Sequence, residues 1–313
     1  ASTLVTKTYT KSVDFANFAR YITELYTNAS KSTVTNNNIT YNYATSESLM
    51  NDRLGGTTSS LDGGNIRYYG ASPNNYVYFN CSDYANQTSS TCELWRIIGN
   101  IPVCLTSGCA NAENRVKIIR NDSIGSIKYG SNSTWMGSNI QNLLNTCYLG
   151  KQSSCDSYCY SYSTSAKGTC DYSADGIDIT DYYGKMIEDV YFNVGAGDST
   201  YKTAANYYTQ EIATHATTSS KIGLMYASDW GYAIEGFTGI LGSSGSPQNS
   251  SNKNWLFSNG YEWTMSAYSS SKPLLVSHYG YLDNFSASRG CSIRPVLYLK
   301  SNVYVVSGTG TKV

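Results

Sequence analysis

The sequence predicts an α+β fold with long, irregular loops held together by disulfides. Three kinds of pattern lead to this prediction. Short apolar runs between turn residues indicate strands, stretches of helical periodicity indicate helices, and nine cysteines, eight of them closely spaced, indicate disulfides. A chain of 313 residues is long enough for one large core. We expect an N-terminal segment over residues 1–66 and a main domain over residues 67–313.

The N-terminal segment is expected to contain a strand, a helix and a connector. Residues 1–10 alternate weakly between apolar and polar side chains, which predicts a strand. Residues 12–27 place apolar side chains at helical spacing, and Ser12 or Asp14 can cap the start of that helix. Residues 28–66 are polar and rich in turn residues, so we expect an extended connector there.

Strands are expected to dominate the main domain. Helical spacing predicts helices over residues 138–145 and 180–191, and the polar composition of residues 150–172 and 241–253 predicts loops. Short runs of β-branched and aromatic residues predict the strands. These runs cover residues 76–79, 94–98, 116–120, 221–226, 255–257, 261–266, 274–277 and 293–299.

The cysteine spacings indicate local disulfides. Cys81 with Cys92 and Cys104 with Cys109 are the two clearest pairs. Disulfides persist in oxidising compartments, so we expect an extracellular protein that is secreted or displayed on a cell surface. Eight cysteines are expected in disulfides: Cys81, Cys92, Cys104, Cys109, Cys147, Cys155, Cys159 and Cys170.

Zinc binding is the competing interpretation of these cysteines. Cys155 and Cys159 have a spacing that a metal could use, but zinc sites usually bring a second close pair of ligands. The chain has only two histidines, His215 and His278, both distant in sequence. We therefore expect no metal. The ninth cysteine, Cys291, is either a free thiol or the long-range partner of Cys147.

Charge and hydropathy exclude two classes of partner. The chain carries 22 basic and 22 acidic residues and no basic cluster, so nucleic acid is not an expected partner. No apolar stretch approaches the ~20 residues that a membrane helix needs, so we expect no membrane insertion. A chain that starts at Ala1 without a signal peptide fits a processed secreted form.

Enzymatic chemistry finds little support in the sequence. Two histidines leave little room for histidine-based catalysis, and no G-x-S-x-G motif is present. The segment from Asp171 to Gly176 resembles the start of a calcium-binding EF-hand loop, but Tyr182 stands where a glutamate ligand is needed. Asp178 and Asp181 are better explained as caps of a following helix. We expect no catalytic residue and no cofactor.

Five segments together resemble a known group of proteins. These are Tyr-Val-x-Phe, Leu-Trp-Arg-Ile-Ile-Gly, Val-Lys-Ile-Ile-Arg, Tyr-Glu-Trp-Thr-Met-Ser and the final Arg-Pro-Val-Leu-Tyr-Leu, followed by a Gly-Thr-Gly tail. The pattern is similar to uncharacterised secreted surface proteins of gut Firmicutes with a C-type-lectin-like domain of the formylglycine-generating-enzyme type. The resemblance covers residues 67–310 and implies an irregular C-type-lectin-like fold.

This resemblance also carries two departures. The Glu-Pro-Asn or Gln-Pro-Asp triplet of calcium-dependent sugar-binding lectins is missing, so we do not expect their calcium chemistry. The oxidase branch of the group uses two close cysteines with a metal, and Cys291 has no near partner, so we do not expect that activity. Fold analogy alone supplies no function.

Tyrosine is the most unusual component of the chain, with 30 residues. Tyrosine beside Ser, Gly and Asn is typical of contact surfaces, although tyrosine also covers strands well. In the related fold the C-terminal third makes the binding face. Among the tryptophans, we expect Trp95, Trp255 and Trp263 in the core. The expected contact residues are Trp230, Tyr232, Tyr268, Tyr279, Tyr281 and Asp283.

These observations predict a non-enzymatic, adhesin-like binding module that recognises a glycan or a protein on another surface through tyrosine-rich loops. The alternative is a structural subunit of an extracellular filament or surface layer, whose partners are neighbouring copies of the chain. In that case the first ten residues would form a strand donated to a neighbour's sheet.

Overall fold

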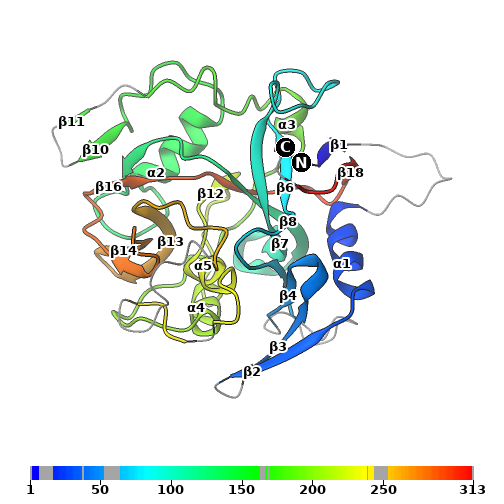
Figure 1. The fold of residues 1–313 in the computed structure, drawn as a ribbon. Helices are drawn as coiled ribbons and strands as arrows, with labels where there is room; N and C mark the ends of the chain where they lie inside the picture. Colours follow the sequence, from blue (N-terminus) through cyan, green and yellow to red (C-terminus); the bar gives the residue numbers. More distant parts are fainter. Residues whose placement is uncertain are drawn as a thin grey trace.

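Mostly antiparallel sheets and a few short helices make up this α+β fold (Figure 1). The expected fold class is confirmed at this level. The computed structural model describes residues 2–6, 17–36, 39–52, 64–162, 166–167, 170–237, 239–242 and 253–311.

A nine-stranded sheet runs through the centre of the molecule, in the order β12-β17-β8-β7-β5-β4-β3-β2 with β6 also paired to β7. Its long hairpin of β7 and β8 has a bulge between Ile97 and Gly99. Gly99 is required there because a Cβ would lie 2.1 Å from the carbonyl oxygen of Ile66 on β5. The strands are β2 Ser32–Asn36, β3 Ile39–Ala44, β4 Leu49–Asn51, β5 Ile66–Tyr68, β6 Tyr76–Phe79, β7 Glu93–Cys104, β8 Ala112–Arg120, β12 Ile222–Gly223 and β17 Val296–Tyr298.

The prediction of an extended connector over residues 28–66 is wrong for its described part. β2, β3, β4 and β5 form an antiparallel meander that continues the central sheet. The sheet therefore extends across the domain boundary expected after residue 66. Turn-rich composition concealed short strands that carry buried tyrosines, including Tyr41 and Tyr43.

A second sheet has five strands in the order β15-β14-β13-β16-β9. All its pairs are antiparallel except β13 with β16. Trp263 of β13 is fully buried and donates from Nε1 to the carbonyl oxygen of Ile127 on β9 at 2.9 Å, which ties the middle strand of the sheet to its edge strand β9. The strands are β9 Ser126–Lys128, β13 Glu262–Ser269, β14 Lys272–Val276, β15 Leu282–Asn284 and β16 Gly290–Ser292.

The first strand pairs within the same chain. β1 (Thr3–Thr6) is antiparallel to β18 (Val303–Ser307), and both ends of the described chain lie side by side in Figure 1. A small hairpin of β10 (Tyr160–Tyr162) and β11 (Ala166–Lys167) lies within the loop expected over residues 150–172.

Helix α1 (Phe18–Asn28) packs against β5, β7, β8 and β18. Its apolar face buries Phe18, Ile22 and Tyr26, as helical spacing predicts. Asn17 caps the helix by accepting from the Arg20 amide. The expected cap positions 12 and 14 lie outside the described residues.

The other helices are short. The helix expected over residues 138–145 is confirmed as α2 followed by a π-helical turn, whereas the one expected over residues 180–191 is a single turn capped by Asp181. α4 and α5, which pack against each other, had not been predicted. Residues 255–257 form no strand. The elements are α2 Asn139–Asn142, η3 Leu143–Tyr148, α3 Tyr182–Lys185, α4 Ala204–Glu211 and α5 Ala227–Tyr232, with 3₁₀ turns η1 Thr45–Glu47 and η2 Ser107–Cys109.

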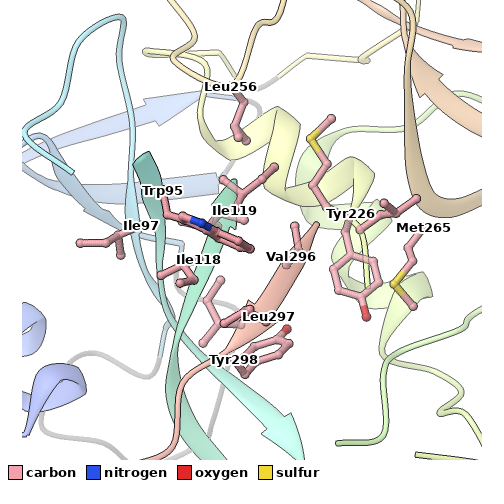
Figure 2. Packing of buried hydrophobic residues seen from close by; sticks show 14 of the residues in the cluster. Trp95, Ile97, Ile118, Ile119, Tyr226, Leu256, Met265, Val296, Leu297 and Tyr298 are labelled. Carbon is pink, nitrogen blue, oxygen red and sulfur yellow. The ribbon is translucent and has the colours of Figure 1, made fainter. Parts of the chain in front are cut away.

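One continuous core joins the central sheet to α5 and to the five-stranded sheet. Figure 2 shows its side chains gathered around β17. Trp95, Trp255 and Trp263 are all buried, as the sequence predicts. The residues labelled in Figure 2 are Trp95, Ile97, Ile118, Ile119, Tyr226, Leu256, Met265, Val296, Leu297 and Tyr298.

Candidate functional site

Four disulfides staple the loops. Both pairs expected from spacing are confirmed, and Cys291 is a buried free cysteine and not a partner of Cys147. Because disulfides persist where thiols are not kept reduced, this set indicates an oxidising environment. The pairs are Cys81–Cys92, Cys104–Cys109, Cys147–Cys155 and Cys159–Cys170.

A histidine that is distant in sequence lies beside one of these disulfides. His215 Nδ1 is 3.4 Å from Cys104 Sγ and 2.9 Å from Asn193 Oδ1. Cys104, Cys109 and His215 are close enough together to hold a metal. His215 is therefore close to these cysteines in the fold, although it is distant from them in the sequence. In this structure the two sulfurs are bonded to each other.

The strongest candidate site is a group of five aromatic side chains on the five-stranded sheet, which we call the aromatic surface cluster. Tyr279 is 52% exposed and its ring lies nearly parallel to that of Tyr281, at 15° and a centroid distance of 5.8 Å. His278 lies 3.7 Å from Tyr279 and 4.8 Å from Tyr261. Tyr261 in turn lies 5.0 Å from Phe285. The remaining four rings are partly exposed.

A tight turn between β14 and β15 brings these rings to the surface. The Ser277 amide donates to the Tyr281 carbonyl at 2.8 Å, and the Gly280 amide donates to the Ser277 carbonyl at 2.9 Å. Gly280 has φ +79°, a conformation that favours glycine. The turn leaves the Tyr279 ring exposed on a backbone held by two hydrogen bonds, which suits a contact surface because less conformational freedom is left to lose on binding.

Polar groups border the aromatic surface cluster. The Arg289 guanidinium lies 3.9 Å from the centroid of the Phe285 ring, and Asp283 and Asn284 both contact the Tyr201 hydroxyl. The Asn284 amide donates to that hydroxyl at 2.9 Å. Partial burial, with Tyr279 and Asp283 nearby, raises the pKa of Tyr261. The rings therefore lie next to fixed hydrogen-bonding groups of both charges.

The structure separates the six expected contact residues into three sets. Tyr279, Tyr281 and Asp283 lie together at the aromatic surface cluster. Tyr268 is partly exposed and packs on Tyr201, whose hydroxyl reaches Asp283.

The third set, Trp230 and Tyr232, was wrongly expected at the contact surface. Trp230 is 0% and Tyr232 3% exposed, so both belong to the core and present no surface to a partner. Both lie on α5, which had not been predicted, and its packing against α4 and against β13 and β14 of the five-stranded sheet explains their burial. Tyr261, His278, Phe285 and Arg289 had not been proposed. For Tyr261 and His278, the one sequence signal was their position at the expected strands: Tyr261 begins the strand at residues 261–266, and His278 follows the strand at residues 274–277.

Two hollows adjoin each other elsewhere on the surface. One, of about 410 Å³, is lined mostly by hydroxyl and amide side chains, including Asn132, Asn139 and Asn142. The other, of about 370 Å³, is lined by Trp135 and other less polar residues, and both share Thr134 and Met136. The residues that line the two hollows include no aspartate, glutamate, histidine or cysteine.

A buried charge network lies beneath the surface. Arg67 pairs with Asp52 at 2.7 Å and with Asp229 at 2.8 Å, and Lys117 also pairs with Asp229. None of these four side chains is more than 2% exposed. Burial opposes the ionisation of Asp229, but Lys117 and Arg67 outweigh it and hold the pKa of this carboxyl below its usual value.

Glu211 of α4 lies beside this network. It accepts from the hydroxyls of Ser228 and Ser266, both at 2.5 Å, and is 3% exposed. Burial raises the pKa of Glu211. No local sequence pattern indicates this network, because its members come from positions as far apart as Asp52 and Ser266.

No family model, curated protein or solved structure matches this chain. Among the helices of the described residues, none has the length and apolar character to cross a membrane.

Proposed function

We propose that this chain is an extracellular binding module without enzymatic activity, and that it recognises a glycan through the aromatic surface cluster. The observation that carries the proposal is the pair of nearly parallel, solvent-accessible rings of Tyr279 and Tyr281 on a rigid turn. Sugars offer apolar C–H faces that stack on such rings, and their hydroxyls need donors and acceptors at the border.

The border supplies both kinds of group. Arg289 can donate and Asp283 can accept, while Asn284 can do either. Four disulfides support the extracellular location, because disulfides persist in oxidising compartments and are rare where thiols are kept reduced. The likeness to the C-type-lectin-like fold belongs to this proposal and rests on the sequence segments described above.

A glycan array, run beside an array of surface proteins, tests the proposal. The wild-type chain is expected to bind a restricted set of glycans, equally with and without a calcium chelator, because the calcium-binding triplets of lectins are missing. Tyr279→Ala is the disabling variant. Tyr182→Ala is the matched control, since Tyr182 is 55% exposed and stacks on Tyr84 away from the cluster.

The two arrays separate the possible results. Glycan binding that Tyr279→Ala removes and Tyr182→Ala keeps supports the proposal. Binding to proteins alone would assign the cluster to a protein partner, and a flat response on both arrays would count against a binding module.

The filament alternative expected the first ten residues to form a strand that pairs with the sheet of a neighbouring copy. β1, which would have to be donated to a neighbouring copy, pairs with β18 of its own chain. Assembly with other copies stays a prediction without structural support.

A further inference from the structure

Lys117 of β8 is a buried lysine with one hydrogen-bond acceptor. Its side chain is 0% exposed, and Asp229 Oδ2 is the acceptor that the described part of the chain provides. The ammonium otherwise meets aromatic rings, with Nζ 4.1 Å from the Tyr226 centroid and 5.5 Å from that of Tyr298. Burial lowers the pKa of Lys117, and Asp229 offsets only part of this effect.

The two oxygens of Asp229 have different partners. Oδ1 accepts from Arg67 Nη1 at 2.8 Å. Oδ2 accepts from Lys117 Nζ and from the Tyr226 amide at 2.9 Å. Arg67 therefore polarises the carboxyl group through one oxygen, while the other oxygen lies against the amine. A cation therefore lies beside the oxygen that would gain negative charge if the amine attacked Cγ.

The surrounding charges are balanced in a way that permits loss of this pair. Arg67 also holds Asp52, with Nε 2.7 Å from Oδ2. If Lys117 and Asp229 became neutral together, Arg67 and Asp52 would remain as one cation and one anion. Removing two buried charges avoids the free-energy cost of keeping ions out of water.

We propose that Lys117 and Asp229 condense into an intramolecular isopeptide bond between Nζ and Cγ. The ammonium first passes a proton to Oδ2 through their hydrogen bond, which leaves a neutral amine and a neutral carboxylic acid. The amine attacks Cγ, and Oδ1 carries the negative charge beside Arg67. A second proton moves from nitrogen to Oδ2, which departs as water.

The products are one amide and one water molecule, so no oxidant, reductant or further reactant is needed. The amide keeps Oδ1 as its carbonyl oxygen, still placed to accept from Arg67. The bond would join β8 of the central sheet to α5 across 112 positions of the sequence. It would add a covalent constraint that reduction of the disulfides does not remove.

The mass of the intact full-length chain, after its disulfides are reduced, tests this proposal. The wild-type chain is expected to be lighter than its sequence by the mass of one water molecule. Peptide mapping should then find the segments around Lys117 and Asp229 joined. A reduced chain with the full mass of its sequence, together with separate peptides for the two segments, would overturn the proposal.

The masses of three variants test the site, and a mass can be measured even if a variant is less stable than the wild type. Lys117→Met and Asp229→Ala are each expected to have the full mass of their sequences. Asp229→Asn should still react but release ammonia, so its mass deficit should change from that of water to that of ammonia. A water deficit that persists in Lys117→Met would place the loss elsewhere and would also overturn the proposal.

Discussion

Arg67 of β5 and Asp229 of α5 are 162 positions apart in the sequence and form an ion pair, with Nη1 2.8 Å from Oδ1 and neither side chain more than 2% exposed. The same guanidinium holds Asp52, the residue after β4. One side chain thus connects the N-terminal meander to α5. The residues expected to form a connector are tied into the core.

Arg67→Met is therefore expected to destabilise the protein by about 3–5 kcal/mol, because it leaves the buried Asp52 carboxylate without the cation that pairs with it. Urea unfolding measures this loss. Arg20→Ala is the control: Arg20 forms an exposed pair with Glu24, and its loss should cost about 0.5 kcal/mol or less. Equal effects of the two variants would show that the buried network does not stabilise the fold.

Glu211 should give stability a distinct pH dependence. Burial raises the pKa of Glu211, so the native chain holds this proton more tightly than the unfolded chain does. The stability that results is fully present below the unfolded-state pKa and is lost as the pH rises through the folded-state value. Glu211→Gln stays neutral and should not show this loss.

Unfolding free energies of both chains from about pH 4 to about pH 8 test this difference. The variant should gain on the wild type as the pH rises. Glu24→Gln, on the exposed face of α1, is the matched control and should run parallel to the wild type. A Glu211→Gln curve that also runs parallel would mean that Glu211 is ionised in the native state throughout this range.

Local patterns predicted the parts of the fold whose signals are contiguous in sequence. The strand predicted at residues 76–79 agrees with β6 at both ends, and Cys81 and Cys92 pair as their spacing indicates. The predictions failed where tertiary contacts determine structure. Helical spacing continues to Val190, but the helix ends at Lys185, and both Ile187 and Val190 form isolated β-bridges with other segments instead.

The candidate site was half predictable for a similar reason. Tyr279 and Tyr281 are two positions apart and lie close in sequence to Asp283 and Asn284, so their exposure could be inferred from these polar neighbours. Tyr261 and Phe285 join them only because β13, β14 and β15 are neighbours in one sheet. Trp230 gave the opposite error, since composition alone cannot distinguish an aromatic residue in the core from one on a contact face.

Substitution within the aromatic surface cluster should weaken glycan binding without unfolding the protein. Tyr281→Ala is expected to reduce affinity by about 10-fold or more, as for aromatic residues at the centre of an interface. Isothermal titration with a glycan identified on the array measures this change. Tyr182→Ala should bind like the wild type, and an unchanged affinity for Tyr281→Ala would move the binding site away from the paired rings.

Cys291 should be the one thiol of the chain, and its environment should keep it unreactive. Burial raises the pKa of Cys291 to about 12, so almost no thiolate is present at neutral pH. A thiol-reactive chromophore is expected to detect no thiol in the native protein and one after unfolding without a reductant. Unfolding with a reductant should release all nine. Three or more thiols in the unfolded, unreduced chain would mean that a disulfide is missing, and the inference of an oxidising compartment would lose its basis.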